Sequence, residues 1–310
     1  MLLDKEVNDN GVSLYRNSVG TSRYLTRGKK ASLISVVKMQ EAFLLQMLDK
    51  LPHLIKTGRS KMNIQKEMNG NDVEDKTNYG DVDNNTKREM AQNLQNTNST
   101  KMMPGPDKLS PDFQMKFIAV MDSLAAPSAP SLVKSFDLSP HKEAVDLGGG
   151  SGRVSIELAK AYPDMKVALF DLPPVIQIAQ KFNASQQMKN MTYIGGDFMA
   201  GDFPRADLYV LAHVIHGFEN EQIDTLLKKV YKRLSPGGSV LIMEKVLTEE
   251  KDGPDLGITN DLVISLMSQG RERTGAEYNS LLCRHGFRNV VIRHIEGYNY
   301  YDAVMAKKPF

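Results

Sequence analysis

A glycine-rich turn follows a short apolar stretch near the middle of the chain. Residues 144–147 lead into glycines at positions 148, 149, 150 and 152, and a helical pattern begins after them. Because glycine has no Cβ, such a turn lets the backbone approach a ligand closely. The dinucleotide fingerprint would require glycine at position 153, which is Arg153. The turn therefore favours a compact adenosyl ligand over a pyrophosphate-bridged one, with a turn that binds nothing as the alternative.

Carboxylates follow the next two predicted strands. Asp171 lies about 20 residues after the glycines, where a carboxylate can accept hydrogen bonds from both hydroxyls of a ribose. The alternative is that it only caps the helix that begins at Pro173. The third strand ends in Gly196, Asp197 and Phe198. Asp197 is a candidate to hold an adenine amino group with Phe198 against the ring, and a solvated turn is the alternative.

Two histidines, His213 and His216, follow the fourth apolar strand. In an open α/β sheet, ligands bind beyond the carboxyl ends of the strands. A phenol-like hydroxyl has a pKa of about 10, and histidine, with a pKa near 6.5, is the natural base for it at neutral pH. His216 is the candidate general base, a role typically worth about 10²–10⁴ in rate. A purely structural histidine is the alternative. Asp146, beside the glycines, is expected to support the loop through backbone N–H groups.

Apolar strands alternate with amphipathic helices throughout the second half of the chain. This pattern predicts a mostly parallel sheet with both faces covered, which is the doubly wound α/β class. The last two strands are separated by a loop too short for a parallel crossover, so they must be antiparallel. The clearest helix covers residues 221–234. The expected strands are 144–147, 166–171, 191–195, 206–211, 239–246, 289–295 and 300–306.

The first third of the chain has a different character. Residues 1–26 suggest a hairpin, and an apolar stripe predicts a helix from Ala31 to about Ile55. Residues 58–106 are polar and aperiodic, which indicates a disordered or loosely attached insert. A helix is then expected over 110–133, bent or stopped by the proline-containing stretch 126–130.

Composition excludes several classes of protein. The net charge of +2 with mixed signs argues against a nucleic-acid surface. The single cysteine, Cys283, excludes an internal disulfide and a cysteine metal cluster, and no other metal site is expected. No apolar run approaches the roughly 20 residues of a membrane span, and the N-terminus has no secretory signal. A cytoplasmic protein is expected.

Several of these motifs occur together, in order and at close spacing. The set resembles the catalytic domain of the acetylserotonin O-methyltransferase family and of related plant caffeate-type enzymes. The motifs that carry the resemblance are Phe136-Asp137-Leu138-Ser139, Val145 to Gly152, Phe170-Asp171-Leu172-Pro173, Gly196-Asp197-Phe198, the His216 strand and Pro236-Gly237-Gly238. The resemblance implies a class I S-adenosylmethionine-dependent fold with a seven-stranded sheet over 108–310. It also implies a remnant of a winged-helix dimerisation domain over 1–60 and a polar insert over 61–107.

The resemblance also implies roles for single residues. His216 would deprotonate a small aromatic hydroxyl, with an N-acetylserotonin-like hydroxyindole as the first candidate substrate. Glu244 falls where the family has a carboxylate near that histidine, and a plain strand-end charge is the alternative. A homodimer through the N-terminal helix is also implied. The residues expected to contact S-adenosylmethionine are Gly148, Asp171, Gly196, Asp197, Phe198 and His213.

The chain departs from the family pattern at several positions. Gly217 replaces an aspartate, His213 replaces an arginine or lysine, and Phe218 replaces a tryptophan. The sequence also begins part-way into the dimerisation domain, whose early helices contribute to the partner's substrate pocket in the family. These departures keep a second hypothesis open, in which the protein binds S-adenosylmethionine without catalysing transfer. A nicotinamide oxidoreductase is disfavoured by Arg153, and a nucleic-acid-binding protein by the balanced charge.

Overall fold

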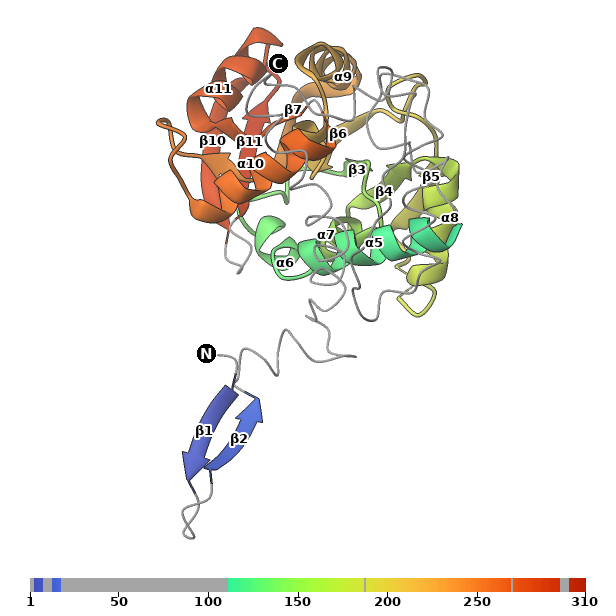
Figure 1. Cartoon of the computed structure of the whole chain (residues 1–310). Helices are drawn as coiled ribbons and strands as arrows, with labels where there is room; N and C mark the ends of the chain where they lie inside the picture. Colours follow the sequence, from blue (N-terminus) through green and yellow to red (C-terminus); the bar gives the residue numbers. More distant parts are fainter. Residues whose placement is uncertain (1–2, 8–12, 18–110, 187, 269, 296–300) are drawn as a thin grey trace, which may run out of the picture.

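The computed structural model describes residues 3–7, 13–17, 111–186, 188–268, 270–295 and 301–310. Its central element is a seven-stranded sheet with the order β10-β11-β7-β6-β3-β4-β5 (Figure 1). The predicted fold class is therefore confirmed. The strands of this sheet are β3 (Glu143–Leu147), β4 (Lys166–Asp171), β5 (Met191–Gly195), β6 (Ala206–Ala212), β7 (Leu234–Glu244), β10 (Arg288–Ile295) and β11 (Tyr301–Lys307).

Strand directions follow the predicted pattern. β3 pairs in parallel with β4 and β6, and β4–β5 and β6–β7 are also parallel. β11 runs antiparallel to both β7 and β10, as expected from the short connection between the last two strands. The main difference lies in β7, which begins at Leu234 instead of residue 239 and ends at Glu244. The carboxyl ends of β3, β4 and β6 therefore meet at one edge of the sheet.

Helices cover the two faces of the sheet (Figure 1). Alternate strand residues point to opposite faces, so Leu208 and Val210 pack in one core with α6, α7 and α8. Tyr209 and Leu211 pack in the other core with α9 and α11. The bounds of these helices, with α10, are α6 (Ala129–Leu132), α7 (Arg153–Ala161), α8 (Pro173–Phe182), α9 (Asn220–Arg233), α10 (Asp255–Met267) and α11 (Gly275–Arg284).

Helix α5 (Pro111–Ala125) is tied to the start of α7 by a buried ion pair. The carboxylate of Asp122 accepts hydrogen bonds from Nε and Nη2 of Arg153, at 2.9 and 2.7 Å. It also accepts the hydroxyl of Ser151 at 2.9 Å. The predicted interruption after α5 is confirmed, because α6 is a separate helix that begins at Ala129. The pair fixes α5 next to the glycine turn.

The N-terminal part of the chain is described only in two short strands. β1 (Leu3–Val7) and β2 (Ser13–Asn17) form an antiparallel hairpin, in line with the predicted hairpin. The helix predicted over 31–55 and the polar insert over 58–106 lie outside the described residues. The domain boundaries at 60 and 107, and a dimer through the helix, remain predictions. Within the described ranges, no helix combines the length and the apolar character needed to cross a membrane.

Removal of one member of the Asp122–Arg153 pair should destabilise the protein strongly. The two side chains are only 10 and 11% exposed, so Asp122→Ala would leave a buried guanidinium without its partner. We expect the free energy of unfolding, measured by urea denaturation, to fall by about 3–5 kcal/mol.

The exposed ion pair of Lys166 and Glu143 provides the control, with side chains 82 and 54% exposed. Lys166→Ala should cost less than about 1 kcal/mol. Replacing both members of the buried pair, as in Asp122→Leu with Arg153→Met, should recover much of the loss. Equal costs for the buried and the exposed single variants would contradict this account.

Candidate functional site

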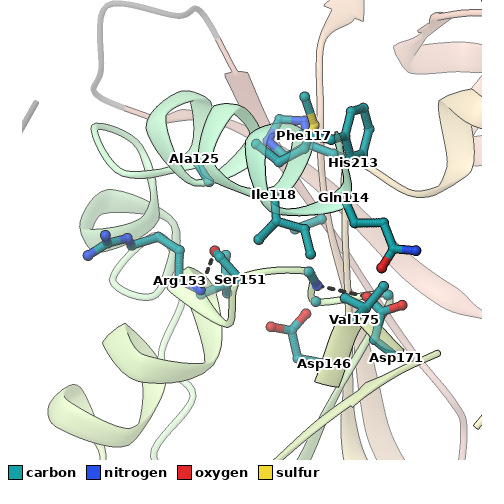
Figure 2. A pocket seen from close by; sticks show the side chains of 16 residues that line it. Gln114, Phe117, Ile118, Ala125, Asp146, Ser151, Arg153, Asp171, Val175 and His213 are labelled. Atoms are coloured by element: carbon teal, nitrogen blue, oxygen red, sulfur yellow. Dashed lines mark hydrogen bonds between the residues drawn. The ribbon is translucent and has the colours of Figure 1, made fainter. Parts of the chain in front are cut away.

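A cavity lies between the glycine turn and helix α5. Figure 2 shows Gln114 and Ile118 on the α5 side of this cavity and Asp146 and Asp171 on the strand side. The cavity is lined by Gln114, Phe117, Ile118, Met121, Ala125, Asp146, Gly148, Gly149, Gly150, Ser151, Arg153, Val154, Asp171, Val175, Ala212 and His213. Of the residues predicted to contact the cofactor, it brings together Gly148, Asp171 and His213.

The glycine turn has the backbone conformation that the sequence suggested. Gly148 and Gly150 have φ angles of +70 and +57°, in the left-handed region that favours glycine. No atom lies within 4 Å of the position that a Cβ on Gly150 would occupy, so the turn presents open space to the cavity. A Cβ on Gly148 would instead lie 3.3 Å from the ring of Phe198, which places Phe198 beside the turn.

The carboxylate of Asp171 is held against this turn. Its Oδ2 accepts the N–H of Gly150 at 2.9 Å (Figure 2). Its Oδ1 accepts the N–H of Leu172 at 2.7 Å. Burial raises the pKa of Asp171 to about 6, against the opposing effect of these hydrogen bonds. Each oxygen retains a second lone pair, which a ligand hydroxyl can use.

Asp146 is fully buried at the end of β3. Its Oδ2 accepts the hydroxyl of Ser155, at 2.7 Å, so it links the strand to α7. Asp146 was predicted to support the loop through backbone N–H groups, and its contacts are with the hydroxyl and the backbone N–H of Ser155 in α7. Among the described residues, Oδ1 of Asp146 has no hydrogen-bonding partner. Burial, with the charge of Asp171 nearby, raises the pKa of Asp146 to about 6.

The third predicted cofactor motif lies next to the cavity but does not line it. The N–H of Gly196 donates to the backbone oxygen of Asp171 at 2.9 Å. Asp197 is exposed, and its Oδ1 accepts the N–H groups of Met199 and Ala200 at 2.7 and 3.1 Å. These contacts are those of a solvated turn. A role for Asp197 in adenine recognition therefore remains a prediction.

The chain turns sharply where β6 ends. His213 has a φ of 58°, which is uncommon for a residue with a side chain. A short 3₁₀ turn over Ile215–Gly217 follows, so both histidines lie just beyond the strand. The ring of His213 packs edge-on against Tyr301, with centroids 4.5 Å apart, and lies 6.0 Å from the ring of His216.

His216 is held by two buried carboxylates. Its Nδ1 lies 2.9 Å from Oε2 of Glu244 and 3.0 Å from Oε1 of Glu272. Oε1 of Glu244 accepts the N–H groups of Val214 and Ile215, each at 2.9 Å. The carboxylate predicted to lie near the histidine is therefore in contact with it, and it also fixes the turn that carries the histidine.

The two histidines have opposite electrostatic environments. Burial alone would lower the pKa of His216, but Glu244 and Glu272 outweigh it and raise the pKa to about 10. Burial, together with the charges on His216 and Lys245, lowers the pKa of His213 to about 3. The site therefore holds a protonated ring and a neutral ring side by side.

Glu272 was missed by the sequence analysis. It lies between Arg271 and Arg273, a pattern typical of an exposed charged loop, yet it is only 1% exposed. Two contacts hold it in place: its N–H donates to Asp261 at 2.7 Å, and Asn260 donates to its Oε1. No local pattern marks its burial, because the contacts come from α10.

Two glycines shape the turn that carries His216. A Cβ on Gly270 would lie 1.8 Å from the backbone oxygen of His216, so no side chain fits there. Gly217 is the opposite case, because no atom lies within 4 Å of its Cβ position. Gly217, which stands where the family pattern has an aspartate, therefore borders open space.

Comparisons with known proteins identify the family of the chain. A family model described as an O-methyltransferase domain matches residues 98–288. Acetylserotonin O-methyltransferase from Gallus gallus is 35% identical over 210 residues, which is 68% of this chain and 60% of the relative. The Bos taurus enzyme of the same name is 35% identical over 199 residues, 64% of this chain and 57% of the relative.

The fold comparison gives the same result. The crystal structure of human N-acetylserotonin methyltransferase in complex with SAM has a TM-score of 0.78 and 26% identity, covering 100% of this chain and 79% of the other. The chain spans about 60% of the length of the Gallus gallus relative. With the family model matching more than half of the sequence, the chain belongs to the O-methyltransferase domain family.

Proposed function

We propose that the protein binds S-adenosylmethionine in the cavity beside the glycine turn and methylates a small aromatic hydroxyl, with His216 as the general base. One observation carries the proposal. His213 lines the cavity, and its ring lies 6.0 Å from that of His216, whose Nδ1 contacts two buried carboxylates. A ligand site and a positioned base are therefore adjacent.

The residues of the cavity fit this donor. Asp171 offers free lone pairs on both oxygens to the ribose hydroxyls, and open space faces Gly150. Oδ1 of Asp146, without a partner among the described residues, is suited to the ammonium group of the methionine part. Ile118 and Val175 supply apolar walls. When bound, the donor supplies an electrophilic methyl group on a sulfonium.

The chain's own residues then hold and move the proton of the acceptor. Nδ1 of His216 donates to the carboxylates, which leaves Nε2 as the atom available to the acceptor hydroxyl. The ring must be neutral to accept a proton, and with a pKa of about 10 it is protonated in the free protein. A positive charge bound nearby lowers that pKa, so donor binding favours the form of His216 that can act as a base.

The names of the relatives indicate which class of methyl acceptor to test. The curated relatives carry the name acetylserotonin O-methyltransferase, so a hydroxyindole of that kind is the first acceptor to test. The human solved structure likewise carries that name. We propose likewise that the protein is cytoplasmic and forms a homodimer through its N-terminal segment. A protein that binds the donor without transferring its methyl group is the second outcome that the experiments below distinguish.

Donor binding can be tested by isothermal titration calorimetry with S-adenosylmethionine. We expect Asp171→Asn to weaken binding by at least about tenfold, because hydrogen bonds to a charged group contribute roughly 1.5–3 kcal/mol each. Asp164, an exposed acid in the same domain, provides the control, and Asp164→Asn should bind like the original protein. No binding to the original protein, or equal binding by both variants, would argue against the cavity as the donor site.

Transfer can be tested with methyl-labelled donor and a panel of phenols, catechols and hydroxyindoles. His216→Ala should lower kcat by at least about tenfold, and typical general-base contributions reach 10²–10⁴. Its affinity for the donor should not fall. His285, which pairs with Asp224 away from this site, gives the control variant His285→Asn. An unchanged rate in His216→Ala removes the histidine from the mechanism, and donor binding without any transfer favours the non-catalytic hypothesis.

The pH dependence of kcat/KM tests the role of the carboxylates. Because His216 has a raised pKa and must lose its proton to act, the rate should rise with pH through the alkaline range. Glu272→Gln removes one negative charge with little change of shape, so the pKa of His216 should fall and the rising limb should move to lower pH. If the rising limb instead reported ionisation of the acceptor, Glu272→Gln would leave it at the same pH. An unshifted limb would therefore contradict its assignment to His216.

A further inference from the structure

We propose that His213, His216 and Glu244 form a binding site for zinc, and that zinc bound there inhibits methyl transfer. One donor atom from each of the three residues lies within 4.8 Å of the other two. Two imidazoles and a carboxylate are a ligand set that zinc accepts in proteins, with the remaining position open to water. The inhibition, but not the binding, rests on the proposed function.

The dimensions of the cluster suit a metal after a small adjustment. Zinc binds imidazole nitrogen at about 2.0–2.1 Å, so two rings on one ion have centroids roughly 5 Å apart. The rings of His213 and His216 are 6.0 Å apart, so their centroids need to approach by about 1 Å.

Two buried atoms of the cluster have unused capacity to bind a cation. Among the described residues, Nε2 of His213 is buried and makes no hydrogen bond, although a buried polar atom normally has a partner. Oε2 of Glu244, on a side chain with no exposed surface, makes only its ion-pair contact with Nδ1 of His216. A cation bound through Nε2 of His213 would supply the partner that this nitrogen lacks. Glu272, 3.0 Å from the same Nδ1, adds a second negative charge beside the site.

His216 cannot bind zinc and act as a base at the same time. A neutral imidazole has one nitrogen with a free lone pair, because the other carries the hydrogen. Once that lone pair binds zinc, His216 cannot accept a proton from a hydroxyl. His213 lines the donor cavity but is not the proposed base, so a variant at His213 can remove a zinc ligand while the base is kept.

Zinc binding is tested directly on the full chain after chelator treatment and dialysis, by calorimetric titration with zinc chloride. Cobalt chloride gives a second signal, because tetrahedral cobalt absorbs visible light. We expect one equivalent of zinc per chain. His213→Asn should weaken binding by at least about tenfold, since even indirect partners of a metal ligand change affinity by 10–100-fold. Asparagine is chosen because it tolerates the left-handed backbone at this position.

His285→Asn is the control, because it removes a histidine outside the cluster, one that pairs with the carboxylate of Asp224. It should bind zinc like the original protein, and thermal melts check that both variants are folded. Absence of zinc binding, or equal affinity in His213→Asn, would overturn the site.

The inhibition is measured separately. In the transfer assay, zinc should inhibit the original protein, and His213→Asn should need at least about tenfold more zinc to lose half of its own metal-free rate. Zinc binding without inhibition would overturn the inhibitory role. A protein that shows no transfer at all fails the proposed function, while the titration still decides the zinc site.

Discussion

The candidate site depends on the contacts made by the buried carboxylate of Glu244. It is completely buried at the end of β7, and a buried carboxylate is tolerated only when its oxygens are satisfied. Oε1 accepts backbone N–H groups of the turn after β6, and Oε2 lies 2.9 Å from Nδ1 of His216. The same group therefore joins two neighbouring strands, sets the path of the turn and orients the histidine. A change at Glu244 would alter all three together.

This turn also connects the histidine to the cavity. His213 leaves β6 in a left-handed conformation, which lets it line the cavity while His216, three residues later, contacts the two carboxylates. On the opposite side, the Asp122–Arg153 pair holds α5 across the glycine turn. The cavity is therefore bounded by elements that are each fixed by a buried ionic contact. Such contacts specify a geometry even where their net contribution to stability is small.

Features that depend on local sequence could be predicted, and features that depend on distant contacts could not. The strands, the antiparallel ending, the glycine turn and the placement of Asp171 in the cavity follow from patterns a few residues long. Glu272 contacts His216 across 56 positions of sequence, and it is buried because α10 supplies Asn260 and Asp261 around it. In the sequence, Arg153 was informative only because it stands where the dinucleotide fingerprint has glycine. Its ion pair could not be predicted, because its partner Asp122 lies 31 residues earlier.

The replacement of the family's aspartate by Gly217 has less effect on the charge around His216 than the sequence alone suggests. An aspartate beside the base would contribute negative charge, but Glu244 and Glu272 already supply two carboxylates at Nδ1 of His216. They raise the pKa of the ring to about 10 without it. The open space at Gly217 lies on the turn that carries His216. Glycine in place of the family's aspartate therefore alters the space beside His216 more than the charge around it, and this weakens the argument for a protein that only binds the donor.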